Sequence, residues 1–479
     1  MGYLRQYQVT LACSLGNFII GIIFVWPSYT LKLYTSANTT LLDEPLSDMQ
    51  SALVGSLPSL GAMVSTMFAG VMLNTLGRQK VGLCVAMPFL LSWLLIDLSS
   101  SATLLLLGRF LSGLACGVCF VLAPVFISEI ADQSIRGSLA AAPTAFYCFG
   151  VLMSFVMGWT LSFKYIIWTN IFICVLYAAL LLSVKESPVF LLMKNNEEEA
   201  RKSIAYYKGM FVDSKPVLAE LSRLKQQLMP AFELMTVTAD GKIDEAEKEK
   251  LNPDQADVNT EKISPFKMLL FSATSRRAFT VVAITISFQV MMGMVAVQVY
   301  AAEIFQRAAP SLSSDMCSVL FALVLLSGCL SCAFFSDKFG RKPLIIGSSV
   351  GVTLCLLSMA FLMQTNIGPA WVIAVLILVF CFSFMFGAGS VPYVLLAEVF
   401  LPEVQNLASM LLLELVWLLN FGLVGVFPFM IKFLGIHGSF YFFAVFGVLD
   451  VLAGIFLVPE TKGLSREQIQ KALQGRRKT

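Results

Sequence analysis

Long runs without Asp, Glu, Lys or Arg divide the chain into apolar segments separated by short polar ones. A helix needs about 20 mostly apolar residues to cross a bilayer, and lipid offers no hydrogen-bond partner to an open backbone. The run 343–397 is long enough for two spans, and the polar segment 364–369 divides it. The predicted spans are 6–31, 49–77, 81–98, 110–128, 137–163, 165–184, 278–302, 316–336, two within 343–397, 404–431 and 433–458.

Charged residues of both signs concentrate between the sixth and seventh spans. This pattern predicts a solvated linker with short helices, one of them over Ala219 to Met229. The first run is interpreted as a span and not a signal peptide, because it is too long and lacks a small-residue cleavage site. The predicted organisation is a six-helix half (1–184), a linker (185–277), a second six-helix half (278–458) and a tail (459–479).

The distribution of lysine and arginine predicts the orientation of the spans. Of 33 such residues, Arg109 lies within a span and four lie in the loops opposite the termini, namely Lys32, Lys164, Arg307 and Lys432. The rest lie on the side of both termini, which the positive-inside rule places in the cytosol. The sequon at Asn38 then falls in an outer loop, where glycosylation is expected.

Composition excludes several classes of protein. Charged residues make up 13% of the chain and apolar residues 57%, whereas a soluble domain carries about 25% charged residues. A large soluble globule, a disordered chain and a nucleic-acid binder are excluded, the last because the net charge is only +3. A single histidine, His437, excludes His-based triads and multi-His metal sites. We expect no cofactor, and the pairs Cys116 with Cys119 and Cys329 with Cys332 are interpreted as buried, inert thiols.

Three signatures at span ends occur once in each half, in the same order and at a nearly constant offset. They indicate duplicated six-helix halves, an architecture of secondary transporters. Arginine and glutamate at helix ends supply charge-assisted hydrogen bonds that can form and break as an inner gate closes and opens. The predicted gating residues are Arg78, Glu129, Arg136 and Glu186 in the first half and Asp337, Arg341, Glu398 and Glu460 in the second.

These residues resemble the sugar porter family of the major facilitator superfamily over essentially the whole chain. The segment Pro143 to Phe146 with Gly150 is more similar to the insect trehalose-transporter branch than to the mammalian glucose carriers. The matching strings are Gly108–Phe110, Pro124–Glu129 with Arg136–Gly137, Glu186–Pro188, Asp337–Lys342, Gly387–Glu398 and Pro459–Gly463.

The resemblance implies an all-α integral membrane protein of the major facilitator fold, with twelve helices in two pseudo-symmetric halves. It also implies a small-molecule substrate, a sugar or polyol, that crosses the cell membrane through a central site by alternating access. Gln289, Gly293, Ala296 and Tyr300 would share one face of a continuous seventh helix. The candidate substrate-binding residues are Gln289, Trp417, Tyr393, Tyr300, Thr144 and Asn420.

Several positions depart from the family pattern. Expected amides and a glutamate are replaced by other residues, so the resemblance does not imply hexose as the substrate. Asn74 and Gln405 each replace a charged gate residue, which predicts a weaker inner gate. The replaced site positions are Val290, Val295, Thr144, Met385 and Val416.

Ionisable residues within spans are costly and often functional. Glu414 lies three residues before Trp417 and is a candidate for proton coupling or a buried neutral acid. The first span contains no acidic partner for Arg109, so Arg109 is expected to be structural and bonded to carbonyls. Arg109 nevertheless remains, after Glu414, the second candidate for coupling transport to protons.

Three functions remain open. Facilitated diffusion of a sugar or polyol leads. A transporter-like sugar sensor is a second class, although such proteins usually have longer cytosolic tails than this one. The third is a proton symporter through Glu414, or a carrier of a less polar solute. An enzyme is not expected, because no nucleophile–base pair or phosphate-binding loop occurs in a suitable context.

Overall fold

The computed structural model describes residues 2–132, 134–240, 265–464 and 468–469. Six helices form the first half. Ser47 begins α2 with a capping box, in which its hydroxyl and the side chain of Gln50 each bond the other residue's backbone N–H. The six helices are α1 (Gly2–Thr35), α2 (Asp48–Leu76), α3 (Arg78–Asp97), α4 (Ala102–Ile130), α5 (Arg136–Thr160) and α6 (Phe163–Leu182).

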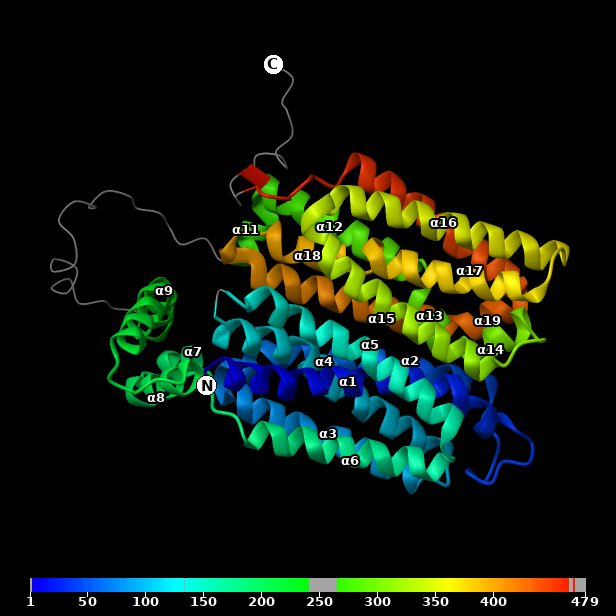
Figure 1. Cartoon of the computed structure of the whole chain (residues 1–479), viewed down its shortest axis with the longest axis horizontal. Helices are drawn as coiled ribbons and strands as arrows, with labels where there is room; N and C mark the ends of the chain where they lie inside the picture. The colour runs from blue at the N-terminus through cyan, green and yellow to red at the C-terminus, as the bar shows by residue number, and fades with distance from the viewer. Residues whose placement is uncertain (1, 133, 241–264, 465–467, 470–479) are drawn as a thin grey trace, which may run out of the picture.

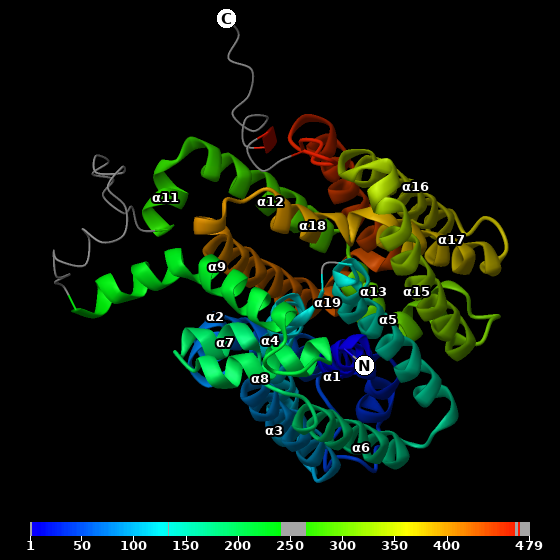
Figure 2. The same ribbon diagram turned by 60° about the vertical axis from the view of Figure 1, so that its left-hand side comes forward.

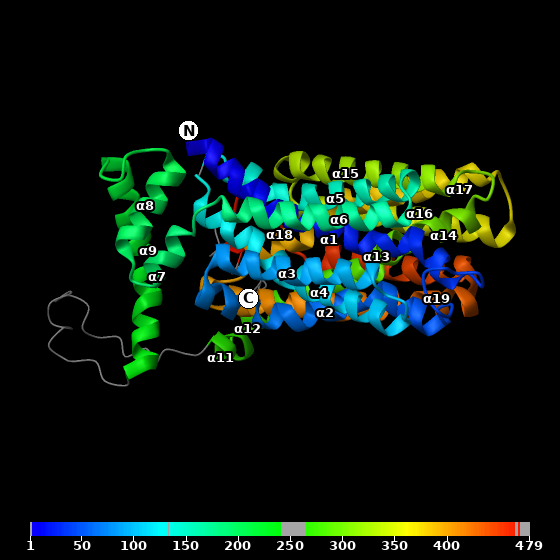
Figure 3. The same ribbon diagram turned by 90° about the horizontal axis from the view of Figure 1, so that it is seen from below.

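The predicted linker is helical where the structure describes it. It contains α7 (Pro188–Met193), α8 (Glu197–Lys208) and α9 (Lys215–Asp240). The helix expected over Ala219 to Met229 is therefore present, within the longer α9. These helices lie beyond the ends of the spans, at the end where α1 begins (Figure 1), and α9 runs across the span direction (Figure 3).

The second half begins with α11 (Pro265–Phe271) and α12 (Ala273–Met291), followed by α13 (Met294–Val299) and α14 (Ala301–Ala308). The continuous seventh helix that was predicted to align Gln289 with Tyr300 is therefore wrong. Gly293 has a left-handed φ of 83°, and a Cβ there would overlap the ring of Phe443. Because φ/ψ also depart from helical values at Tyr300, the face predicted from 100° per residue does not continue across these breaks.

The remaining spans follow the prediction. They are α15 (Ser314–Phe339), α16 (Arg341–Thr365), α17 (Ala370–Ser383) with the π turn η1 (Phe384–Ala388), α18 (Val391–Glu398) and α19 (Pro402–Phe456). Eleven segments of the described residues are long and apolar enough to cross a membrane. The last of them, Val404–Phe456, contains Gly435 with a φ of 70°, so it comprises two spans and brings the total to twelve.

Helix ends extend beyond the charge-free runs. For example, α12 begins at Ala273 and carries Arg276 and Arg277 in its first turns. Such long basic side chains are tolerated near a helix end, because their charged groups can reach the aqueous interface.

The two halves lie side by side (Figure 2). Within the first half α1 packs on α5 and α2 on α4, whereas α2 against α19 and α5 against α15 join the halves. A substrate site between the halves must therefore lie among these four helices and their neighbours.

Candidate functional site

Four aromatic side chains from both halves meet at the centre of the protein. Trp417 stacks on Phe24 with ring centroids 6.2 Å apart and planes at 9°, and it meets Phe120 edge-on at 5.6 Å. Phe120 also lies 6.5 Å from the ring of Tyr393. Phe24 and Phe120 come from α1 and α4, and Tyr393 and Trp417 from α18 and α19, so this central aromatic cluster joins the two halves.

Four polar atoms on α12 and α19 lack partners among the described residues. They are Oε1 of Gln289, Nε1 of Trp417, Oδ1 of Asn420 and Oε1 of Glu414. A buried polar atom without a partner costs about 1–3 kcal/mol, so such groups mark places where a ligand or water supplies the bond. Their chemistry suits a polyhydroxyl solute, because a hydroxyl both donates to the three oxygens and accepts from the indole N–H.

Gln289 connects α12 to the cluster. Its amide nitrogen donates to the carbonyl of Gly389 at 3.4 Å, and its side chain also bonds Tyr393. Gln289 is 7% exposed. The structure therefore connects Gln289, Tyr393 and Trp417 through Phe120 and the bond between Gln289 and Tyr393.

Two of the sequence candidates occupy other surroundings. The hydroxyl of Tyr300 donates to the carbonyl of Val424 at 3.3 Å and faces Gly55 of α2. Thr144 is exposed on α5, whereas the other five candidate side chains are buried or partly buried.

Contacts between the halves gather on the side away from the linker helices. The amide of Gln298 donates to the hydroxyl of Tyr147 at 2.8 Å, and the backbone N–H of Ala302 donates to Ser28 at 3.0 Å. An ion pair at 3.0 Å joins Lys432 to Asp48 on the surface. These interactions join the two halves on this side.

At the opposite end, a cage of charged residues lies within the first half. Arg78 contacts both carboxylate oxygens of Glu129, at 2.6 and 2.9 Å, and also donates to the carbonyl of Leu73. Ser187 donates to Glu129 at 2.5 Å. Glu186 accepts from the backbone N–H groups of Arg78 and Gln79, so its charge lies at the N-terminus of α3, where the helix dipole favours an anion.

The second half repeats this cage. Arg341 donates to Glu398 at 2.8 Å, and Thr461 donates to the other oxygen of Glu398 at 2.6 Å. Glu460 accepts from the backbone N–H of Arg341 at 3.0 Å and of Lys342 at 3.2 Å, which open α16. The duplication predicted from the sequence is therefore present in the structure residue by residue.

A glycine makes each cage possible. Gly77 and Gly340 have φ of 99° and 91°, in the region that side chains rarely adopt. A Cβ at Gly340 would lie 2.7 Å from Oε2 of Glu460, and one at Gly77 would overlap Glu186. The tight turn between paired spans thus brings the helix N-terminus onto the glutamate.

The two cages differ in burial, which predicts unequal costs of disruption. The side chains of Arg78 and Glu129 are 5% and 12% exposed, whereas those of Arg341 and Glu398 are 13% and 27% exposed. Glu129→Gln replaces charge-assisted bonds in the drier cage and is expected to cost about 2 kcal/mol. Glu398→Gln is expected to cost about 1 kcal/mol, because water screens its cage. Melting temperatures of the two purified variants test the order, and equal shifts would contradict it.

Glu460 predicts a pH dependence of stability. Burial alone would raise the pKa of Glu460, but the backbone N–H groups of Lys462, Arg341, Lys342 and Thr461 outweigh burial and hold the pKa below its usual value. A depressed folded-state pKa stabilises the protein above the unfolded value of about 4.3, and this stabilisation is lost as pH falls through the folded pKa. The difference in melting temperature between wild type and Glu460→Gln should therefore shrink on acidification from neutral pH. A melting-temperature difference that grows on acidification would contradict the assignment. The matched control is Glu303→Gln, which changes an exposed glutamate that pairs with Arg307 outside the cage.

Three further candidates have distinct places. The fully buried Arg109 donates from Nε to the carbonyl of Val54 at 2.9 Å and from Nη2 to that of Ile23 at 2.8 Å. Arg136 is exposed and makes two long bonds of 3.4 Å, to the carbonyls of Ser128 on α4 and of Ala131 after it. Asp337 lies in the last turn of α15, and its side chain lies outside the described part.

Comparison with known proteins decides the family. The sequence profile of the family described as "Sugar (and other) transporter" matches residues 14–473. The chain belongs to this family. It is a multi-pass membrane protein of the major facilitator fold, as the resemblance implied.

Named relatives match along nearly all of the chain. This chain is 26% identical to a facilitated trehalose transporter of Polypedilum vanderplanki, in an alignment that covers 98% of this chain and 88% of the relative. It is 27% identical to the same-named protein of Anopheles gambiae, covering 98% of this chain and 56% of the relative. The chain thus spans most of the first protein and about half of the second.

Solved structures show the same fold. The inward-open xylose transporter XylE of E. coli superposes with a TM-score of 0.76 at 20% identity, covering 98% of this chain and 99% of that one. Its partially occluded inward-open form gives a TM-score of 0.74 at 19% identity, covering 95% and 100%. Both likenesses concern the fold.

Proposed function

We propose that this protein carries a sugar or polyol across the cell membrane by alternating access, as a facilitated-diffusion carrier without a cofactor. The observation that carries the proposal is the central aromatic cluster with its unpartnered polar atoms, located where the two halves meet. Apolar C–H faces of a sugar pack on aromatic rings, and its hydroxyls satisfy the amide and indole groups. The names of the relatives support trehalose as the first sugar to test.

Substrate-binding roles are proposed for Gln289, Trp417, Tyr393 and Asn420, which would line a central chamber between the two halves. For Tyr300 we propose a role in closing the chamber, because its hydroxyl bonds Val424 beside Gly55 of the opposite half. The approach of Tyr300 to Gly55 crosses between the halves, so it must be lost when the chamber opens on that side.

Uptake by proteoliposomes tests the function. The panel comprises trehalose, glucose, xylose, sorbitol and an apolar solute, each with empty liposomes as control. Saturable uptake of at least one sugar or polyol is expected, with counterflow but without accumulation against a gradient. Saturable uptake of the apolar solute alone would overturn the proposal, as would no uptake of any sugar or polyol.

Proton symport is the second candidate, favoured by the unpartnered Oε1 of Glu414 on the half that carries Trp417. If Glu414 couples transport to protons, an imposed pH gradient should drive accumulation, and Glu414→Gln should abolish accumulation while leaving counterflow intact. Accumulation that persists in the variant would contradict this role.

The orientation is also proposed, with both termini cytosolic. Asn38 is exposed in the loop between α1 and α2, on the side away from the linker helices. Glycosidase treatment of the protein from a eukaryotic host is expected to increase its mobility, and Asn38→Gln should already migrate at the faster position. Identical migration of all four samples would show that the sequon is unused and remove this support.

A further inference from the structure

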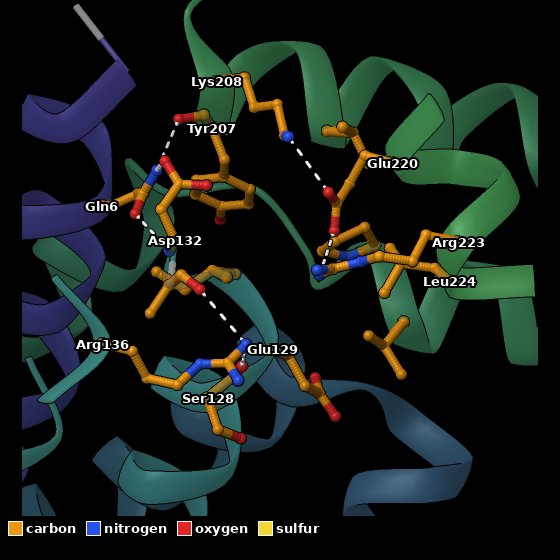
Figure 4. Close-up of a pocket in the computed structure, with 15 residues that line it drawn as sticks. Gln6, Ser128, Glu129, Asp132, Arg136, Tyr207, Lys208, Glu220, Arg223 and Leu224 are labelled. Carbon is orange, nitrogen blue, oxygen red and sulfur yellow. Dashed lines mark hydrogen bonds and ion pairs between the residues drawn. The ribbon is translucent and has the colours of Figure 1, made fainter. Parts of the chain in front are cut away.

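A pocket of about 380 Å³ lies at the linker end of the first half, outside the central chamber. It is lined by the start of α1, the end of α4, the start of α5 and helices α7 to α9 (Figure 4). Its size is within the range of small-molecule sites. It borders the first-half cage at Glu129 but contains none of the proposed substrate-binding residues.

The three acidic side chains of the pocket already have partners. Glu220 accepts from Lys208 at 3.2 Å and from Arg223 at 2.6 Å. Asp132 accepts from the amide of Gln6 at 2.9 Å. The third acid, Glu129, belongs to the cage with Arg78. Arg78 compensates the charge of Glu129, Lys208 and Arg223 compensate that of Glu220, and Asp132 is bonded to a neutral amide.

Donors, in contrast, are left over among the described residues. Nε of Arg223 is buried without a partner, and Figure 4 shows its guanidinium directed from α9 toward the pocket. Arg136, which also lines the pocket, makes only the two 3.4 Å bonds, longer than the usual 2.7–3.2 Å of a good N–H···O bond. In addition, α5 begins at Arg136 without a side-chain cap. The pocket thus has spare hydrogen-bond donors on the guanidinium groups of Arg136 and Arg223.

We propose that this pocket binds a phosphate-bearing anion, which Arg136 on α5 and Lys208 and Arg223 on the linker helices hold between them. Guanidinium groups match phosphate oxygens with paired, charge-assisted bonds. The phosphate belongs either to a free metabolite or to the headgroup of a lipid of the adjacent leaflet. Because Arg136 belongs to the first half and Lys208 and Arg223 belong to the linker helices, the bound anion fastens these helices to the first half.

Binding of radiolabelled inositol trisphosphate to the full-length protein in phosphatidylcholine nanodiscs tests the site. Wild type is expected to bind saturably, and Arg223→Gln should weaken binding at least about tenfold, because it removes a charge-assisted donor pair. Lys208 still pairs with Glu220 in this variant. Repeating the measurement in nanodiscs that contain a minor fraction of phosphatidylinositol bisphosphate separates the sources. Competition by this lipid indicates a headgroup, and unchanged binding indicates a free anion.

Arg201→Gln is the matched control. Arg201 lies on α8, pairs with the exposed Asp213 and does not line the pocket, and its side chain is 35% exposed against 40% for Arg223. It should bind like wild type. Lys208→Gln provides a second pocket variant if Arg223→Gln is unstable.

Failure of wild type to bind in either membrane would overturn the proposal, as would equal weakening by Arg201→Gln or normal binding by both pocket variants. Sugar uptake by Arg223→Gln is expected to be unchanged without the probe, so this result is independent of the proposed transport function.

Discussion

Replacing Arg109 with leucine is expected to destabilise the protein by about 4 kcal/mol, because two carbonyls in adjacent helices lose their charged donor. The guanidinium is completely buried and bonds Ile23 of α1 and Val54 of α2 at once. The ring of Trp26 also lies 5.3 Å from its central carbon. Arg109→Leu should give little monodisperse protein after extraction, and its melting temperature should fall far below that of wild type.

Arg109→Lys separates charge from geometry. A lysine keeps the positive charge, but its compact ammonium lacks the fork with which the guanidinium reaches both carbonyls. The variant should therefore lie between wild type and Arg109→Leu. Arg307→Leu, which removes an exposed arginine paired with Glu303, should cost almost nothing. If Arg109→Leu were as stable as the control, the structural role would be refuted.

The fold could be predicted largely from the sequence, because span length and charge position are properties of single segments. The turns at Gly77 and Gly340 could be identified from the sequence, because in each a glycine stands directly before an arginine between two apolar runs. The duplicated cages follow from the same spacing. The buried Asp450 was visible as a charge in a span, but its partner, Ser349 at 2.6 Å, is 101 residues away and leaves no local signal.

The centre of the protein was less predictable. Phe24 and Phe120 lie in apolar runs, where a phenylalanine that faces the chamber has the same local pattern as one that faces lipid, such as the exposed Phe172. The break at Gly293 was also missed, because an isolated glycine is tolerated within a helix. Only the packing of Phe443 against that backbone shows why the helix breaks there.

The largest effect on transport is expected at Trp417 and Gln289. Trp417→Ala removes the ring between Phe24 and Phe120 and the indole N–H, so both the apolar and the polar contact with substrate are lost. Gln289→Ala removes an amide whose oxygen has no partner among the described residues, and an unmade bond of this kind is worth about 1–3 kcal/mol. Each variant should lower the ratio of maximal uptake rate to KM by about tenfold or more.

The division between KM and maximal rate distinguishes substrate contact from a general packing defect. Loss of a substrate contact raises KM for the sugar identified in the uptake panel, whereas a packing defect lowers the amount of active carrier and with it the maximal rate. Trp417→Phe keeps a ring on Phe24 but lacks the N–H, so it should recover only part of the affinity lost in Trp417→Ala. Trp159→Ala, at an exposed position of α5, is the matched control and should leave both parameters unchanged. Wild-type kinetics in both Trp417→Ala and Gln289→Ala would place the substrate elsewhere than the aromatic chamber.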